Sequence, residues 1–274
     1  MAGRILVGTQ GWNYAAWVGP FYPEGTRPAD FLSTYAQAFG TVEVDSTFYA
    51  IPPVNSVRGW ERRTPEGFVF ALKMPQEITH ERRLAPAADD ALELFLERAR
   101  LLGPKLGPVL VQMGPDFLPS EWDALERFVP RLPGDVRFAL EVRHFKWMRP
   151  QVLPDLLSLL AEHGVALALS DGKWIDRETV LDLAERPTAD FHYLRWMGPN
   201  RDLTDFSHVQ VDRSDETAAW ADVLGRVLGR GMDVFGYFNN HFAGHSPASA
   251  RDLQRRLGIP PVEPRQIGEQ ISLF

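Results

Sequence analysis

The stretch Val42–Tyr49 carries two acidic residues, Glu43 and Asp45, two positions apart in a mainly apolar run. In a β-strand, alternation places Glu43 and Asp45 on one side and Val42 and Val44 on the other. Burying carboxylates without partners is costly, so a fold that buries this strand must neutralise them or use them. A pair of this kind can transfer protons, with one carboxylate assisting the other. Glu43 and Asp45 are therefore the first candidate catalytic residues.

Short apolar runs that end in polar or glycine residues recur along the chain. Eight of them are predicted strands: Ile5–Val7, Val42–Val44, Phe68–Leu72, Val109–Val111, Phe138–Val142, Ala166–Leu169, Phe191–Leu194 and Val234–Phe238. Helical spacing lies between them, at Ala29–Phe39, Pro53–Arg63, Ala87–Leu102, Ser120–Arg131, Pro150–His163, Asp215–Arg230 and Pro247–Leu257. Eight strands that alternate with helices predict parallel βαβ units closed into a (β/α)₈ TIM barrel of the α/β class.

The domain organisation predicted from these elements is a single barrel over residues 1–258 and a short C-terminal tail over residues 259–274. A length of 274 residues suits one barrel of about 250 residues. Ser246 before Pro247 predicts a helix N-cap followed by proline at the first helical position. The connection Gly198–Ser214 has no clear helical pattern, and long connections of this kind often act as lids.

Composition narrows the classes of function. The absence of cysteine excludes a disulfide framework, a thiolate nucleophile and a Cys-ligated zinc site. A formal net charge of −7 argues against broad non-specific binding to nucleic acid. The start Met1–Gly8 lacks a signal-peptide apolar region, and no apolar run approaches the roughly 18 residues of a membrane helix. We therefore expect a cytoplasmic protein without a membrane partner.

Active sites of TIM barrels form at the C-terminal ends of the strands. The polar or aromatic residues expected at that face are Gln10, Trp12, Glu43, Asp45, Thr47, Lys73, Gln112, Glu141, Arg143, His144, Asp171, Lys173, Arg195, Asn239, Asn240, His241 and His245. Among them, Glu43, Asp45, Lys73 and Glu141 are the expected catalytic residues. Substrate binding is assigned to Trp12, Arg143, Arg195, Asn239, Asn240 and His241. Charge on so many strand ends predicts where a site lies, but it does not identify the reaction.

Each charged candidate also has a structural explanation. Glu141 and Arg143 suit a same-face ion pair, and Lys73 suits an ion pair with Glu43 or Glu141. Arg195 suits either an anionic substrate or a salt bridge to Glu43 or Asp171. These alternatives stay open on the sequence alone.

The sequence does not determine whether the protein holds a metal or a cofactor. The spacing of His241 and His245 ligates a metal only on one helical turn, and Gly244 with the expected cap at Ser246 places them in a loop. Seven histidines would suit a divalent metal with oxygen and nitrogen ligands, but no spacing requires one.

Several motifs together resemble the YecE-like family, a domain of unknown function assigned a TIM-barrel fold. They are Gly8–Tyr14, Phe21–Pro23, Val42–Tyr49, Phe70–Arg83, Phe138–His144, Tyr193–Arg195 and Tyr237–His241. The resemblance spans nearly the whole chain and implies the fold, but no established activity. Two departures weaken a transfer of site residues at strands seven and eight. The family often has histidine where this chain has Met197, and asparagine where it has Ser249. A wider fold-level similarity to endonuclease IV and xylose isomerase barrels is analogy.

The last five residues, Gln270–Phe274, resemble the short peptide by which bacterial repair and replication proteins dock on the DNA sliding clamp. The prolines of Pro260–Pro264 favour an extended approach. Leu273 and Phe274 would enter an apolar pocket, and the Gln270 amide would fix the register. In the alternative, Leu273 and Phe274 fold back and fill a gap in the barrel wall.

Three functions follow from these residues. The leading hypothesis is a hydrolase or lyase on a phosphate-containing substrate, such as damaged nucleic acid. In it, Glu43 or Glu141 is the general base or a metal ligand with Asp45 as partner, and Lys73, Arg143 and Arg195 bind the anion. In a second hypothesis, Glu43 and Glu141 form the carboxylate pair of a carbohydrate enzyme. In the third, the barrel is a non-catalytic adaptor whose tail binds a partner.

Overall fold

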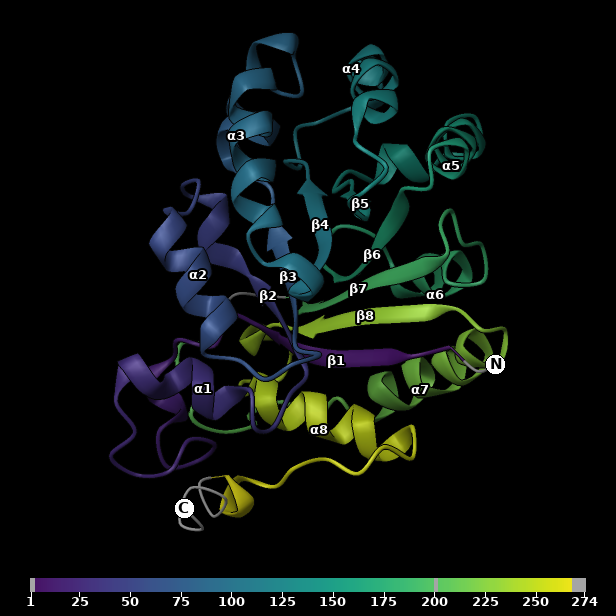
Figure 1. Cartoon of the computed structure of the whole chain (residues 1–274). Helices are drawn as coiled ribbons and strands as arrows, with labels where there is room; N and C mark the ends of the chain where they lie inside the picture. The colour runs from purple at the N-terminus through teal and green to yellow at the C-terminus, as the bar shows by residue number, and fades with distance from the viewer. Residues whose placement is uncertain (1–2, 200–201, 268–274) are drawn as a thin grey trace.

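The computed structural model describes residues 3–199 and 202–267 and shows a closed barrel of eight parallel strands in chain order (Figure 1). The strands are β1 (Ile5–Gln10), β2 (Thr41–Val44), β3 (Val69–Lys73), β4 (Leu106–Gln112), β5 (Phe138–Glu141), β6 (Ala166–Gly172), β7 (Phe191–Gly198) and β8 (Asp233–Phe238). Pairing of β8 with β1 closes the barrel. All eight predicted strands and the (β/α)₈ barrel are confirmed.

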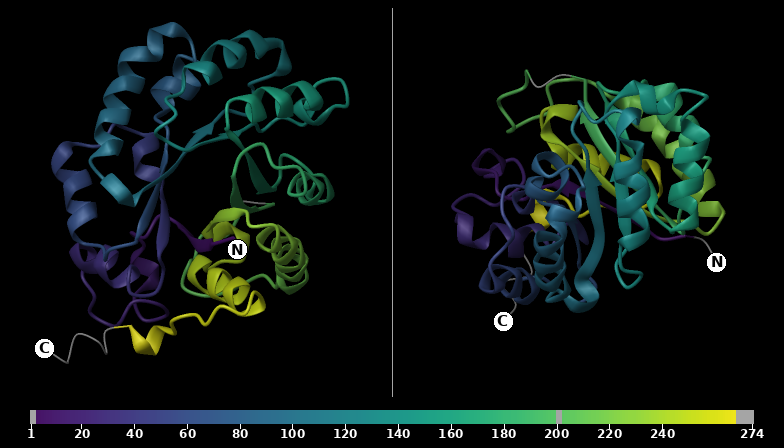
Figure 2. Two further views of the ribbon diagram at one scale, coloured as in Figure 1. Left: turned by 45° about the vertical axis from the view of Figure 1, so that its right-hand side comes forward. Right: turned by 90° about the horizontal axis from the view of Figure 1, so that it is seen from above.

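Helices surround the strands on the outside of the barrel (Figure 2). They are α1 (Phe31–Tyr35), α2 (Val54–Arg62), α3 (Asp89–Arg100), α4 (Trp122–Phe128), α5 (Leu153–Glu162), α6 (Arg177–Leu183), α7 (Ser214–Gly229) and α8 (Ser246–Arg256). The sequence predicted all of them except α6, a helix of seven residues that begins where the Asp176 side chain accepts a hydrogen bond from the Thr179 amide. Between β7 and α7 no described residue is helical, as expected.

The predicted cap of α8 is wrong by one residue. His245 occupies the N-cap position without a side-chain cap, and Ser246 is the first helical residue. The Ser246 hydroxyl instead donates to Asn240 Oδ1 at 2.8 Å. A neighbouring buried acceptor therefore competes with the local capping bond.

Alternation along the strands builds two cores. Side chains that point outward pack against the helices and form the larger cluster. Those that point inward form a separate cluster that includes Ala139 and Tyr193. Because side chains two residues apart share a face, Glu141 and Arg195 continue these inward rows at the C-terminal end of the barrel. The fold therefore requires a charged layer on top of an apolar interior.

The segment after α8 runs along the outside of the barrel (Figure 1). Arg255 forms a salt bridge to Glu263, and Ile267 is buried in the outer core. None of the helices in the described residues is long and apolar enough to span a membrane.

Candidate active site

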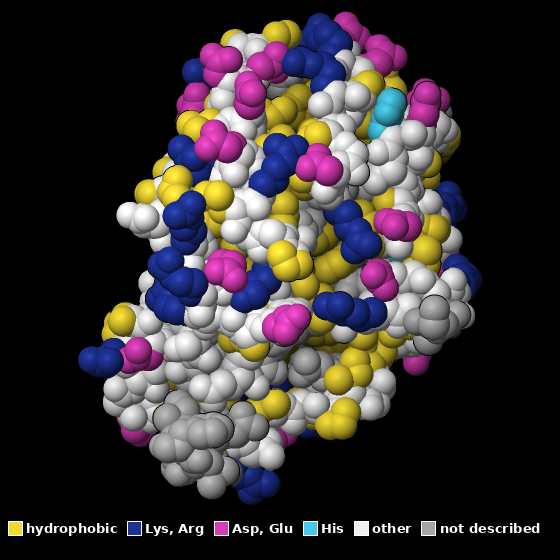
Figure 3. All heavy atoms as spheres, viewed as in Figure 1, with side chains coloured by type: hydrophobic (Ala, Val, Ile, Leu, Met, Phe, Trp, Pro, Cys, Tyr) yellow, Lys and Arg dark blue, Asp and Glu magenta, His cyan; other side chains and the backbone are white. Residues whose placement is uncertain are grey.

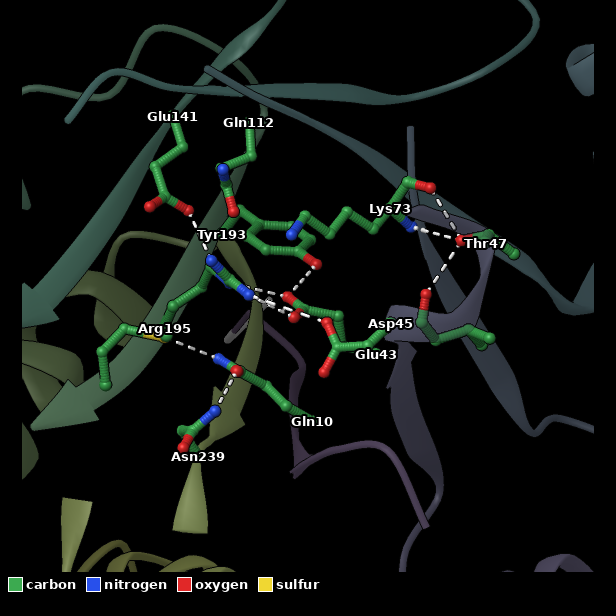
Figure 4. A network of polar contacts seen from close by, with 12 residues as sticks. Gln10, Glu43, Asp45, Thr47, Lys73, Gln112, Glu141, Tyr193, Arg195 and Asn239 are labelled. Atoms are coloured by element: carbon green, nitrogen blue, oxygen red, sulfur yellow. Dashed lines mark hydrogen bonds and ion pairs between the residues drawn. The ribbon is translucent and has the colours of Figure 1, made fainter. Parts of the chain in front are cut away.

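Arg195 joins two buried carboxylates at the C-terminal end of the barrel (Figure 4). Its Nη2 and Nε atoms donate to Glu43 at 2.6 and 2.9 Å, and its Nη1 atom donates to Glu141 at 2.7 Å. Tyr193, one layer below, donates its hydroxyl to Glu43 at 2.7 Å. Both oxygens of Glu43 are engaged, and both glutamate side chains are fully buried. Of the two partners suggested by the sequence, Arg195 therefore pairs with Glu43 and not with Asp171, which binds Arg177.

Arg143 continues this charged layer. Its Nε atom donates to the second oxygen of Glu141 at 2.5 Å, which confirms the same-face ion pair. Burial by itself would raise the pKa of Glu141, but Arg143 and Arg195 outweigh burial and lower that pKa to about 2. Nη1 and Nη2 of Arg143 donate no hydrogen bond to the described part of the chain, and the side chain lines a cavity. Arg143 therefore keeps donors available for an anion.

Asp45 is the partly exposed carboxylate above this charged layer. Strand β2 ends at Val44, and Asp45 begins a 3₁₀ turn that runs to Phe48. Its side chain is 36% exposed, and it lies 3.9 Å from Arg195. Burial, the negative charge of Glu43 and a hydrogen bond to Glu43 raise the pKa of Asp45 to about 7, against the opposing effect of Arg195 and Lys73. Asp45 therefore exchanges a proton near neutral pH.

Lys73 ends β3 on the other side of Asp45. Its backbone is fixed by Thr47, whose hydroxyl donates to the Lys73 carbonyl at 2.7 Å and accepts from the Lys73 amide at 3.1 Å. Its Nζ atom lies 3.6 Å from the centroid of the Phe48 ring. Burial and the positive charge of Arg195 lower the pKa of Lys73 to about 8. Within the described residues the ammonium has no salt bridge, so the expected ion pair with Glu43 or Glu141 does not form.

These side chains surround a cavity of about 330 Å³ at the mouth of the barrel. Its lining comes from the ends of seven strands and the turns that follow them: Gln10, Asp45, Phe48, Tyr49, Lys73, His80, Gln112, Arg143, Arg195, Met197, Asn239 and His241. Glu43 and Glu141 lie beneath this surface. A larger cavity of about 500 Å³, lined by Arg4, Arg137 and Asp233 among others, lies at the N-terminal ends of the strands. Residues at that end of a TIM barrel contribute to stability, whereas catalytic residues lie at the C-terminal end.

His80 and Gln112 are two of the wall residues of the mouth cavity to which the sequence assigned no role. His80 lies on a π-helical turn, Glu77–Glu81, which brings its ring against Phe48 at a centroid distance of 5.0 Å. Gln112 ends β4, and its Oε1 atom is buried without a hydrogen-bond partner in the described structure. The π-turn has no clear sequence pattern, but such turns are frequent at functional sites. Gln112 was identifiable by its place at a strand end.

Two residues predicted to bind substrate lie outside the mouth cavity. Asn240 is turned into the protein, where its Oδ1 accepts hydrogen bonds from Ser246 and Trp17 and so holds the start of α8. Trp12 lies beside a neighbouring cavity. His245, the other half of the histidine pair, is buried with Nδ1 at 2.8 Å from the Phe206 carbonyl. Its ring is therefore used in packing.

The described residues contain no group of three or more histidines and carboxylates placed to hold a metal ion. Glu43 and Glu141, the carboxylates first considered as metal ligands, have all four oxygens engaged by Arg143, Arg195 and Tyr193. The predicted clamp-binding residues Gln270, Leu273 and Phe274 lie outside the described residues.

Similarity to known proteins identifies the family of this chain. The family model described as "Protein of unknown function DUF72" matches residues 6–270. The chain belongs to the DUF72 family. The UPF0759 protein YunF of Bacillus subtilis is 28% identical over 281 residues, which cover 96% of this chain and 99% of YunF. The UPF0759 protein YecE of Escherichia coli is 34% identical over 140 residues, about half of each chain. The expected resemblance to YecE-like proteins is confirmed.

Solved structures of the DUF72 family share the fold. A member from Thermotoga maritima superimposes with a TM-score of 0.76 at 23% identity and covers 93% of this chain and 99% of its own. A member from Enterococcus faecalis gives a TM-score of 0.73 at 22% identity, with coverage of 94% and 98%. At this level of identity the similarity shows that this chain shares the fold of these DUF72 structures.

Proposed function

We propose that this DUF72 protein is a hydrolase or lyase that acts on a phosphate-containing substrate at the mouth of its barrel. The observation that carries the proposal is the half-buried ammonium of Lys73, which has no carboxylate partner in the described residues. It faces the same cavity as Arg143 and Asp45. Burial lowers the pKa of Lys73 even though the charges of Asp45 and Glu43 oppose that shift, so an anionic ligand at the ammonium would stabilise its charge further.

Lys73 and Arg143 would bind the phosphate. The ammonium acts as a point charge, whereas the planar guanidinium can donate two hydrogen bonds in parallel. Gln112 adds an unpartnered acceptor to the same wall, which suits a hydroxyl group of the substrate. Arg195 has its donors committed to Glu43 and Glu141, so it would fix the layer on which the site rests and contribute charge from below.

Asp45 would transfer the proton. A carboxyl group whose pKa lies near the working pH is a good general acid or base. In a hydrolase the Asp45 carboxylate would accept a proton from the attacking water, and in a lyase it would accept one from substrate carbon. This role falls to Asp45 because Glu43 and Glu141, the bases first expected from the sequence, are buried and held by arginine.

The carbohydrate alternative is less well supported. It requires Glu43 and Glu141 to flank a glycosidic bond. The guanidinium of Arg195 occupies the space between them and binds both carboxylates. A sugar could enter there only by displacing a buried arginine that has two ion-pair partners.

A turnover screen tests the proposal. Full-length protein is incubated with a panel of phosphate monoesters, diesters and phosphorylated hydroxy acids, with and without added Mg²⁺ or Mn²⁺. We expect turnover of at least one class, and Lys73→Met should lower kcat/KM about 100-fold because the phosphate loses its buried counter-charge. Lys146→Met is the matched control, since Lys146 does not line the cavity. Binding without turnover under every condition would favour the adaptor.

We also propose that the C-terminal pentapeptide Gln270–Phe274 docks on a bacterial DNA sliding clamp. The support is its sequence, together with the burial of Ile267, which anchors the chain on the barrel just before the peptide. Full-length protein is expected to bind a purified clamp with micromolar affinity, and deletion of the pentapeptide should abolish binding. Leu273→Ala with Phe274→Ala should have the same effect. Equal binding by the truncated chain would refute the assignment.

A further inference from the structure

A second cavity, of about 430 Å³, lies beside the mouth of the barrel and has aromatic walls. Its lining residues are Gly11, Trp12, Asn13, Tyr14, Pro28, Val44, Asp45, Ser46, Trp60 and Arg63. Asp45 lines this cavity and the mouth cavity alike. A ligand that fills both must therefore pass the carboxyl group to which we assign proton transfer.

The aromatic walls are held in place by the fold. Trp12 follows β1, and its carbonyl accepts a hydrogen bond from the Tyr22 hydroxyl at 2.5 Å. The Trp12 and Trp60 rings meet edge to face with their centroids 6.0 Å apart. Tyr14 donates its hydroxyl to the Gln10 carbonyl at 3.1 Å, so its ring cannot swing away without losing that bond. The cavity is thus a preformed aromatic site.

The residues at the edge of this cavity are polar. Asn13, Ser46 and Arg63 are all exposed and supply amide, hydroxyl and guanidinium groups. A flat ring with polar edges fits such a site, because its faces stack on indole and phenol rings while its edge groups reach the rim. A nucleobase has this form.

We propose that the aromatic cavity is the nucleobase subsite of the same centre, and that the substrate is a nucleotide. The inference rests on the proposed function, because the phosphate would lie at Lys73 and Arg143 while the base stacks on Trp12. The bond that reacts would then lie beside Asp45. A mononucleotide suits this protein better than a duplex, since the net charge of −7 repels a polyanion and charges of both signs are mixed over the visible face (Figure 3).

The test compares three ligands by isothermal titration on the full-length chain: adenosine 5′-monophosphate, ribose 5-phosphate and inorganic phosphate. Trp12→Ala should weaken nucleotide binding about tenfold, as expected for the loss of one stacked base, and change the other two affinities less than about twofold. Trp12→Phe should restore most of the affinity. Phe145→Ala is the control, since Phe145 is an exposed aromatic that lines neither cavity.

A second variant, Ser46→Phe, tests the same cavity without depending on the folding of Trp12→Ala. Ser46→Phe adds a ring at an exposed position on the cavity wall and should block the base while phosphate still binds. The nucleobase assignment is overturned if phosphate binds but neither variant affects the nucleotide selectively. It is also overturned, in favour of a sugar subsite, if ribose 5-phosphate binds as tightly as adenosine 5′-monophosphate and the two variants weaken both ligands equally. If neither phosphate nor nucleotide binds the wild-type protein, both the proposed function and the nucleobase subsite are refuted.

Discussion

Replacing Asp45 by asparagine is expected to lower kcat about 10²- to 10⁴-fold on the substrate found by the turnover screen, because the group that transfers the proton is removed. The residual rate should lose the pH dependence that the Asp45 pKa of about 7 gives the wild-type enzyme. Asp116→Asn serves as the control, since its carboxylate is exposed and pairs with Arg83 outside the mouth cavity. Full activity of the asparagine variant would remove Asp45 from the mechanism.

The same variant should be more stable than the wild type above neutral pH. Folding raises the pKa of Asp45 from 3.8 to about 7, so the folded state resists losing this proton. Well below pH 3.8 the group is protonated in both states and contributes no difference. As the pH rises from 4 to 7 the unfolded state is favoured, and that penalty is fully present above pH 7. Asp45→Asn has no such penalty. Denaturant unfolding at pH 4 and pH 8 measures the difference in the free energy of unfolding between Asp45→Asn and the wild type. An equal difference at both pH values would contradict the raised pKa of Asp45.

Arg195→Leu is expected to have the largest effect on stability. The change leaves the fully buried carboxylate of Glu43 without its cation, and it leaves Glu141 with Arg143 as its only ion-pair partner among the described residues. Removing one partner of a buried ion pair typically costs about 3–5 kcal/mol, because the remaining charge cannot be solvated. Urea unfolding at pH 7 should therefore show a loss in that range.

Arg100→Leu is the matched control for this experiment. Arg100 also makes a two-point contact with one carboxylate, at 2.8 and 2.9 Å to Asp135, but both side chains lie on the surface. An exposed pair of this kind contributes about 0–1 kcal/mol. Comparable losses in the two variants would show that Arg195 does not hold the charged layer together.

The fold was predictable because each strand of this barrel is a short apolar run that ends abruptly. Val42–Val44, for example, is bounded by polar residues and lies in β2 with one residue added. The miss at α6 has a local cause, since Arg177–Leu183 is too short to show a clear helical period. Ser246 before Pro247 predicts a cap, but its hydroxyl binds Asn240, an acceptor on the preceding 3₁₀ turn that the local pattern does not reveal.

The place of the site was predictable, but the division of roles within it was not. Strand-end position identified Asp45, Lys73 and Arg143 as residues of one face. Which carboxylate receives Arg195 depends on how β2, β5 and β7 meet across the barrel, and Glu43 and Arg195 are 152 positions apart in the chain. Strand alternation predicted Glu43 and Asp45 on one side, but β2 ends at Val44 and Asp45 begins a 3₁₀ turn, so Glu43 is buried while Asp45 is partly exposed.

Calorimetric titration of the full-length protein with inorganic phosphate at pH 7 tests whether the mouth of the barrel is an anion site. We expect saturable binding of one phosphate per chain, weakened at least tenfold by Lys73→Met and by Arg143→Met and unchanged by Lys146→Met. Binding should also weaken as the pH rises past about 8, where Lys73 loses its charge. Phosphate binding that ignores Lys73 and Arg143, or no binding at all, would contradict an anion site at the mouth of this barrel.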